Sequence, residues 1–374
     1  MPDSRRGGEP VLTRRKVLAA AGGALALRAQ GDARLWIPGR RRYGAPVTHV
    51  VAGKTVPAGV RLLDPAPWPG LRVPREDGTF VAGPSGPAWI QTNAWAIQWE
   101  RYRAPGMAVW LAPEKPEDRT LTTEQCLLAL CDCEASGARW ILECDEASFA
   151  GIAEALRFFE AHRAWRDFQT PLHIGLVASS RPEMREVMNL MCRFAVPYRL
   201  VRAPLPGMSV LVLAGSPDSA ANAFAREGGL VISLGWTALT QKAEGSSDWV
   251  DTKLGAGMIS AWKGPITNAQ RFVKDLTAKL GEDHDVVRAF NVHASTVRYT
   301  VRDEDQRGLV QIVNFTGRPF QEVTTIWVRQ IASRAVLHEW KGKPRALEIS
   351  RTGGGTEISI PERGIYAAVE LFPA

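Results

Sequence analysis

Short apolar runs alternate with segments of helical spacing between residues 88 and 168. The runs have the length of strands and lie at 88–93, 108–112 and 139–143. Helices are predicted near 95–103, from 123 to 136, and at 150–165. Thr122 or Thr123 would cap the second helix, and Gly137 would end it. Three consecutive strand–helix units predict parallel strands, as in part of a (β/α) barrel.

The pattern changes twice after residue 168. Strand and helix segments first continue at 173–178, 182–194, 197–201, 209–214, 219–227 and 229–234, which predicts a small flavodoxin-like sheet. An irregular stretch and a helix at 268–280 follow. Period-two alternation then predicts strands at 297–301, 309–314, 324–329, 334–338, 357–360 and 365–371. The C-terminal part is therefore expected to be a small antiparallel β-sandwich.

The sequence thus predicts an α/β plus all-β chain in five segments. These are a leader at 1–31, an irregular arm at 32–87, a partial (β/α) barrel at 88–168, a flavodoxin-like domain at 169–284 and the sandwich at 285–374. The arm is rich in Pro, Gly and Arg, and only 48–51 and 60–63 within it are strand-like. Because a complete barrel has eight strands, three units predict a remnant whose first half is missing. The open sheet edge would be covered by the arm, a second chain or the flavodoxin-like domain.

The net charge of +7 belongs to the N-terminal region. Residues 1–42 carry ten Lys or Arg and three acids, whereas the remaining chain carries 36 basic and 36 acidic residues. Nucleic-acid binding uses a basic surface on the folded part of a protein. The charge distribution therefore argues against nucleic acid as a partner.

The leader has the order of a twin-arginine export signal. Arg14 and Arg15 precede a weakly apolar segment at 19–27, as in a Tat signal. That segment is too short to span a bilayer. We therefore expect a periplasmic or secreted protein with no stable membrane insertion after export, and a disordered basic tail is the alternative. No Ala-x-Ala site directly follows the segment, which leaves cleavage open.

The five cysteines are predicted to be structural. All of them lie in apolar runs, at Cys126, Cys131, Cys133, Cys144 and Cys192. The spacing of Cys131 and Cys133 differs from that of zinc-binding pairs, and no His lies nearby at ligand spacing. The glycines at 353–355 lie between two predicted strands, so they predict a loop and no phosphate cradle. We therefore predict no bound metal and no cofactor.

Carboxylates follow two of the predicted parallel strands. Glu114 comes just after the run at 108–112, and Glu143 and Asp145 lie at the end of the next run. Sites in (β/α) proteins lie at the carboxyl ends of the strands. Paired carboxylates at such an edge are the groups that cleave glycosidic bonds. The sequence therefore predicts catalytic positions at Glu114, Glu143 and Asp145, with a solvated acidic loop as the alternative.

Polar and aromatic side chains near the end of the first predicted strand suggest sugar contacts. Gln91 and Asn93 lie at that strand end and could hydrogen-bond sugar hydroxyls. Trp95 and Trp99 follow it and could stack on the faces of sugar rings. Tryptophans inside the strands are instead expected in the core.

Three segments resemble family-42 β-galactosidases and related clan-A glycoside hydrolases. They are Val109–Pro116, Leu309–Phe315 and Gly364–Leu371, and the resemblance covers about Ala88–Phe372. It implies that the first segment is the seventh barrel strand, whose glutamate, here Glu114, is the nucleophile. It implies that the other two are core strands of the sandwich. In that family the acid/base glutamate comes from the fourth strand, which has no counterpart before Ala88.

The flavodoxin-like domain resembles a class I glutamine amidotransferase scaffold. Those enzymes place a cysteine on a sharp strand–helix turn, whereas this chain has Ala214-Gly215-Ser216 there. We therefore expect no amidotransferase chemistry. In the related glycosidases this domain mediates oligomerisation, which implies a homo-oligomer.

The sequence favours an exported, degenerate glycoside hydrolase-like protein that binds carbohydrate or acts as an assembly scaffold. The alternative is an active retaining glycosidase of the β-galactosidase type. In that case Glu114 would be the nucleophile, and Glu143 or Asp145 would be the acid/base.

Overall fold

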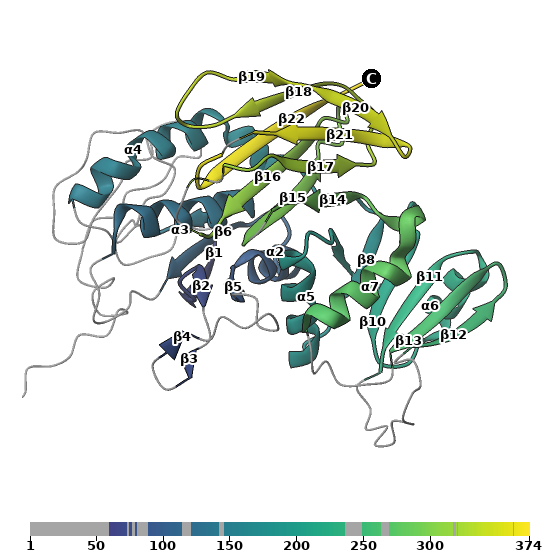
Figure 1. Cartoon of the computed structure of the whole chain (residues 1–374). Coiled ribbons are helices and arrows are strands. Elements are labelled where there is room, and N and C mark those ends of the chain that lie inside the picture. Colours follow the sequence, from purple (N-terminus) through teal and green to yellow (C-terminus); the bar gives the residue numbers. More distant parts are fainter. Residues whose placement is uncertain are drawn as a thin grey trace, which may run out of the picture.

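The computed structural model describes residues 60–72, 75–76, 79–80, 89–113, 121–141, 146–235, 249–262, 269–292, 294–316, 319, 321–361 and 363–374. These residues form three parts in Figure 1. We call residues 60–168 the first α/β part, residues 169–284 the second α/β part, and residues 285–374 the sandwich.

A three-stranded parallel sheet lies at the centre of the first α/β part. Its order is β1 (Val60–Ala66), β6 (Ala108–Pro113) and β7 (Arg139–Trp140). Helix α2 (Ala94–Arg103) precedes β6, α3 (Thr123–Ala135) connects β6 to β7, and α4 (Glu146–Ala161) follows β7. In the register, Trp110 is opposite Arg139 and Leu111 is opposite Trp140. The prediction that these two strands are parallel neighbours is therefore confirmed for the described residues.

The first strand of this sheet is not the one that the sequence predicted. The predicted strand at 88–93 forms β5 (Trp89–Gln91), which pairs antiparallel with β2 (Gly70–Arg72) in a separate sheet. The first parallel strand is β1, from the region expected to be an irregular arm. Its backbone partners lie on β6, more than 40 residues later in the chain, so no local pattern reveals the pairing. A further antiparallel pair is formed by β3 (Arg75–Glu76) and β4 (Thr79–Phe80).

Helix α3 begins where the sequence predicted. The Thr122 hydroxyl accepts a hydrogen bond from the backbone N–H of Gln125 at 3.2 Å. The Gln125 side chain in turn accepts one from the N–H of Thr122 at 3.0 Å, which completes a capping box. Just beyond the helix, Gly137 has a φ of +73°, a conformation that glycine adopts without Cβ strain. The cap and this glycine mark the two ends of the helix that connects β6 to β7.

The second α/β part holds a six-stranded sheet in the order β12-β13-β11-β10-β8-β9. Its strands are β8 (Ile174–Val177), β9 (Arg199–Val201), β10 (Val210–Ala214), β11 (Leu230–Leu234), β12 (Trp249–Leu254) and β13 (Gly257–Trp262). All but β12 are parallel, and their order across the sheet is the flavodoxin-like 2-1-3-4-5. Helices α5 (Pro182–Arg193) and α7 (Ala269–His284) pack on one face, and α6 (Ser219–Arg226) packs on the other. The predicted flavodoxin-like sheet is therefore present.

The hairpin of β12 and β13 lies where the sequence predicted an irregular stretch. Asp251, Thr252 and Lys253 of β12 are exposed, because this strand is at the edge of the sheet. An edge strand with so little burial carries no alternation of apolar and polar residues. The helix that follows the hairpin is α7, close to its predicted position at 268–280.

Two antiparallel sheets form the sandwich, as predicted. One has the order β14-β17-β21-β20, and the other has the order β15-β16-β22-β18-β19. The strands are β14 (Val287–Phe290), β15 (Ser295–Val301), β16 (Gly308–Asn314), β17 (Thr324–Val328), β18 (Ala332–His338), β19 (Arg345–Leu347), β20 (Ile349–Thr352), β21 (Gly355–Ile360) and β22 (Tyr366–Pro373). Residues such as Ile312, Val328 and Val369 fill the core between the sheets.

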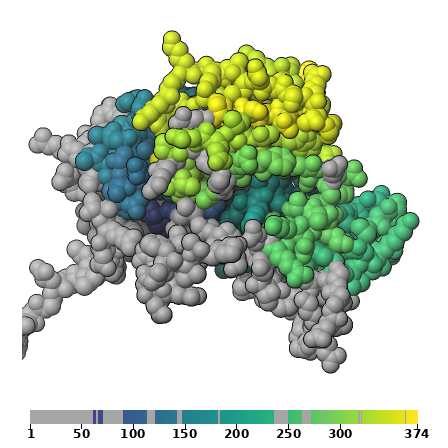
Figure 2. All heavy atoms as spheres, in the orientation of Figure 1, coloured from purple at the N-terminus to yellow at the C-terminus, as the bar shows by residue number. Residues whose placement is uncertain are grey.

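The three parts pack directly against one another. Leu309 and Tyr366 of the sandwich belong to the same buried cluster as the apolar residues of α3 and α4. The ring of Tyr366 lies 5.0 Å from that of Phe159 on α4. Figure 2 shows the yellow-green sandwich seated against the blue residues of these helices. Within the described ranges, no helix is long and apolar enough to cross a membrane.

Candidate functional site

The carboxyl edge of the β1–β6–β7 sheet is the candidate site. Ala66 of β1 is opposite Pro113 of β6 at this edge, and the N–H of Ile141 donates to the carbonyl of Leu111 at 2.7 Å. The predicted catalytic residues Glu114, Glu143 and Asp145 lie outside the described residues. In the chain, Glu114 directly follows β6, and Glu143 is two residues beyond Ile141. The described strands therefore establish only that the two segments leave neighbouring parallel strands at one edge.

Trp68 is an aromatic residue at this edge that sequence reasoning missed. It lies two residues beyond the end of β1 and is half-buried. Its ring packs edge-on against that of Trp140 on β7, with 5.1 Å between the ring centroids. The buried Nε1 of Trp68 has no hydrogen-bond partner in the described part of the chain. The sequence feature that could have revealed Trp68 is the strand-like run at 60–63. Once this run is assigned to the parallel sheet as β1, Trp68 lies just beyond a strand end.

Asn93 holds the loop after β1 against α3. Its side-chain amide donates to the carbonyl of Pro67 at 3.0 Å, and its backbone N–H donates to Asp132 at 3.0 Å. Asn93 is only 2% exposed, so in this structure it is a positioning residue of the edge. Gln91, the other predicted hydrogen-bonding residue, is half-buried on β5. Contact of either side chain with a sugar hydroxyl stays a prediction.

Asp132 is the buried acid of this network. The Thr92 hydroxyl donates to its Oδ1 at 2.5 Å, and both donors of Asn93 lie near its Oδ2. Burial raises the pKa of Asp132 to about 6, although these hydrogen bonds favour the charged carboxylate and oppose the rise. The carboxylate faces protein donors, so its evident role is to hold the turn at Thr92–Asn93.

Trp95 and Trp99 lie on α2, as the sequence predicted. Both are half-buried and pack against the apolar core of the second α/β part. The ring of Trp99 also lies 6.1 Å from that of Tyr102 on the same helix. The two indoles thus help to join two parts of the chain, and their stacking on a sugar stays a prediction.

Metal-binding groups do not gather in the described ranges, where no cluster of three or more His, Cys, Asp or Glu could hold an ion. Cys126, Cys131 and Cys133 are buried in α3, and Cys192 is half-buried on α5. The Sγ of Cys192 lies 3.5 Å from the hydroxyl oxygen of Tyr198. The described cysteines therefore form small parts of the core, as the sequence predicted.

Comparisons by sequence identify no relative. No protein-family model matches the chain. No curated protein matches it either.

Comparisons of structure find glycoside hydrolases. An α-L-fucosidase, isoenzyme 2 from Paenibacillus thiaminolyticus, is similar with a TM-score of 0.56 and 12% identity, covering 75% of this chain and 62% of the fucosidase. A β-galactosidase from Bacillus circulans sp. alkalophilus has a TM-score of 0.48 and 11% identity, covering 74% of this chain and 61% of the other. A β-galactosidase from Rahnella sp. R3 has a TM-score of 0.49 and 10% identity, covering 72% and 58%.

The chain spans about three fifths of the length of these enzymes. Structural similarity at such low sequence identity shows the fold alone. On the strength of the fucosidase comparison, the chain has a glycoside hydrolase-like fold.

Proposed function

We propose that this chain is an exported glycoside hydrolase-like protein that binds carbohydrate at the carboxyl edge of the β1–β6–β7 sheet and does not cleave it. The observation that carries the proposal is the position of Trp68. It is a half-buried indole at the strand edge where (β/α) proteins hold their ligands. An indole supplies a flat apolar face beside a polar N–H, a combination suited to sugar rings.

The proposed loss of cleavage rests on the missing acid partner. In the clan-A family that the sequence resembles, the acid/base glutamate comes from the fourth barrel strand. The parallel sheet of the first α/β part has three described strands. In the resemblance, β6 corresponds to the seventh barrel strand, and no described strand corresponds to the fourth. General acid–base catalysis contributes about 10²–10⁴-fold to rate. A lone nucleophile at Glu114 would forfeit that contribution.

An active retaining glycosidase is the second candidate, and the pairing of β6 with β7 favours it. Neighbouring strands lie about 4.8 Å apart, and retaining enzymes hold their two carboxyl groups about 5–5.5 Å apart. Glu114 and Glu143 follow these two neighbouring strands in the chain. In this mechanism Glu114 attacks the anomeric carbon, and Glu143 or Asp145 protonates the leaving oxygen.

Hydrolysis of 4-nitrophenyl β-galactoside, β-glucoside and α-L-fucoside separates the two candidates. We expect no turnover above that of the Glu114→Gln variant. Turnover that Glu114→Gln abolishes would instead establish the glycosidase.

Glycan binding tests the site itself. We expect oligosaccharide binding, measured on a glycan array and by calorimetry, to weaken about tenfold or more in Trp68→Ala, since the contact between a sugar ring and the indole face is lost. Trp249→Ala is the matched control, because Trp249 is half-buried and packs edge-on against Trp262 at 5.2 Å, far from this sheet. Equal binding by both variants would reject the site. Absence of binding to any glycan would reject the proposal and leave an assembly scaffold.

Export is tested by the twin arginines. Fusion of the full chain to a reporter should place it in the periplasm or medium, and replacement of Arg14 and Arg15 by Lys should retain it in the cytoplasm. Equal export of both forms would contradict the Tat proposal.

A further inference from the structure

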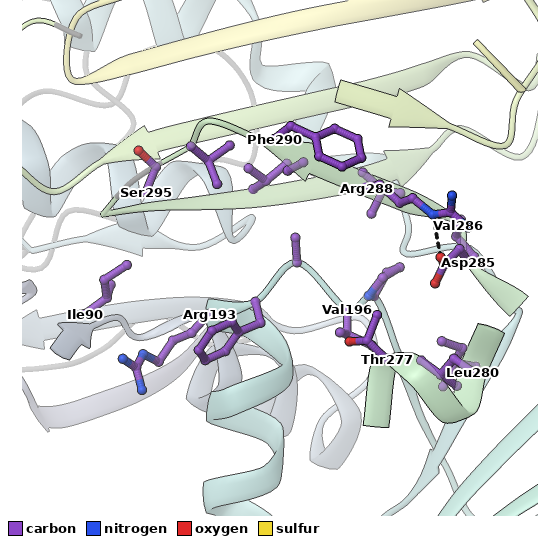
Figure 3. Close-up of a pocket in the computed structure, with 18 of the residues that line it drawn as sticks. Ile90, Arg193, Val196, Thr277, Leu280, Asp285, Val286, Arg288, Phe290 and Ser295 are labelled. Atoms are coloured by element: carbon purple, nitrogen blue, oxygen red, sulfur yellow. Dashed lines mark hydrogen bonds and ion pairs between the residues drawn. The ribbon is translucent and has the colours of Figure 1, made fainter. Parts of the chain in front are cut away.

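A cavity of about 700 Å³ lies between the second α/β part and the sandwich. Its walls come from the end of α5, from α7, and from β14 with residues between β14 and β15. Figure 3 shows the labelled side chains arranged around this space, with Ile90 of β5 at one side. Cavities at domain boundaries with volumes of about 300–1,000 Å³ are the usual places for small-molecule ligands. The volume and the position of this cavity therefore fit a small molecule.

Two exposed aromatic rings belong to the wall of the cavity. Phe194, just after α5, is 37% exposed, and Phe290, at the end of β14, is 49% exposed. Among the large apolar side chains that are exposed in the described part of the chain, these two are the aromatic ones, and both line the same space. Val196 and Leu280 of the wall are buried. Exposed rings gathered at one cavity favour an apolar ligand, because its binding removes them from water.

The charge of Arg288 in the wall is balanced within the protein. Its guanidinium donates to the carboxylate of Asp285, also a wall residue, at 2.6 Å. The charge centre of Arg288 also lies 5.2 Å from the ring of Trp327. An acid and a base of the wall thus satisfy each other, and neither calls for a charged ligand.

The remaining ionisable groups of the described wall, Arg193 and His284, are engaged as well. The guanidinium of Arg193 lies over the ring of Phe194, with its charge centre 5.7 Å from the ring. The Nδ1 of His284 lies 3.0 Å from the hydroxyl oxygen of Ser209. Burial lowers the pKa of His284 below its ordinary value of 6.5, so this ring is neutral at pH 7. A charged ligand would lose its water without meeting an uncommitted charge on these residues.

We propose that this cavity binds a small neutral molecule with an aromatic body, held against the rings of Phe194 and Phe290. Aromatic rings pack favourably on one another beyond the area that they bury. The ligand is neutral because burial of a charge that finds no partner is costly. The site is separate from the carboxyl edge of the β1–β6–β7 sheet and does not depend on carbohydrate binding.

A matched pair of probes tests the proposal on the full chain at pH 7. The probes are 1-naphthaleneethanol and 1-naphthaleneacetate, which share the ring system and differ in charge. Isothermal titration calorimetry should show saturable binding of the alcohol and about tenfold weaker binding of the acid, because the carboxylate loses its water without gaining a partner. The alcohol should also bind with a negative change in heat capacity, which marks the burial of apolar surface.

Two variants locate the binding. Phe194→Ser and Phe290→Ser should each weaken binding of the alcohol about fivefold or more, because contact with an aromatic ring is lost. Val250→Ser is the matched control, since it also replaces an exposed apolar side chain by serine. Val250 lies on β12, at the edge of the six-stranded sheet, and is not part of the cavity wall. This variant should bind the alcohol as the wild type does.

Several results would overturn the proposal. Equal or tighter binding of the acid would show that the site takes a charged ligand. Affinity for the alcohol that is unchanged in both phenylalanine variants, or a heat-capacity change that is not negative, would place the binding elsewhere. Absence of saturable binding of the alcohol up to about 1 mM would reject the site as a whole. Circular dichroism establishes that each variant is folded before it is titrated.

Discussion

The hydroxyl of Thr92 donates a hydrogen bond of 2.5 Å to the carboxylate of Asp132. This contact ties the turn after β5 to the interior of α3, and the neighbouring Asn93 extends it to the carbonyl of Pro67 beyond β1. The turn is fully buried. One buried acid therefore sets the position of the loop that carries Trp68 at the edge of the parallel sheet.

Asp132 makes a pH-dependent contribution to stability. Its folded pKa of about 6 is above the ordinary value of 3.8, so the folded protein holds this proton more tightly than the unfolded chain. The contribution of Asp132 to the free energy of unfolding is therefore fully present below pH 4. It falls by about 3 kcal/mol as the pH rises through 6.

The Asp132→Asn variant isolates this contribution. Urea unfolding of wild type and variant between pH 4 and pH 7 should show that the wild type loses stability relative to the variant as the pH rises. A stability difference that is the same at both ends of this range would show that the carboxylate is already charged at pH 4. Thr92→Val should lower stability at pH 7 by about 1–3 kcal/mol, because the charged acceptor loses its donor.

Glu134 and Arg166 form a buried two-point ion pair. Both hydrogen bonds measure 3.0 Å, and the side chains are 3% and 13% exposed. The pair joins α3 to the 3₁₀ turn η1 (Arg163–Asp167). Arg166→Met should cost about 3–5 kcal/mol of unfolding free energy, because it leaves a charged carboxylate buried.

The double variant Glu134→Leu/Arg166→Met is the control for that prediction. It removes both charges and should be more stable than Arg166→Met alone. Should the double variant be the less stable of the two by urea unfolding, the charge of Glu134 would not be the source of the loss.

Gly257 is packed too closely for any side chain. A Cβ at this position would lie 2.3 Å from the carbonyl oxygen of Gly229 and 2.4 Å from that of Ala225. Gly257→Ala must therefore displace backbone at the start of β13 and should cost about 1–3 kcal/mol. Gly364→Ala is the control, since its Cβ would have nothing within 4 Å. Gly257→Ala should unfold at a clearly lower temperature than Gly364→Ala. Equal midpoints of thermal unfolding would contradict the close packing around Gly257.

The described thiols should be unreactive in the folded protein. Burial raises the pKa of Cys192 to about 11 and the pKa values of Cys131 and Cys133 well above their usual range. At pH 8 only about one in a thousand Cys192 side chains would be thiolate. In a Cys144→Ser background, Ellman's reagent should modify no thiol quickly until denaturant is added. Rapid release of one equivalent of thionitrobenzoate from the folded chain would contradict the burial of these thiols.

Local sequence patterns predicted the helices and strands that bury either one face or their whole surface. The apolar runs of β6 and β7, the cap at Thr122, and the period-two strands of the sandwich appear within a few residues of their predicted places. Alternating strands and helices with short connections also predicted the flavodoxin-like sheet, whose strand order comes from the structure. In these segments the residues that fix the element are neighbours in the chain, so the sequence displays the signal.

Other elements depend on partners that are distant in the chain. Strand β1 contains Asp64 and Pro65, which interrupt its apolar run, and its place in the sheet becomes recognisable only through its pairing with β6. Strand β12 lies at a sheet edge with its centre exposed, so no apolar alternation marks it. The predicted catalytic acids lie outside the described residues, and Trp68 was missed because β1 was assigned to the arm.

By itself the sequence determined the alternation of strands and helices, the change to a sandwich, and the residues that follow the strand ends. Only the tertiary structure decided that β1 completes the parallel sheet, that Trp68 stands at its carboxyl edge, and that Asn93 is buried against Asp132. The physical reason is that hydrophobic periodicity depends on neighbours within a turn or a strand. Strand pairing, burial of polar groups and interdomain cavities depend on contacts between residues tens to hundreds of positions apart.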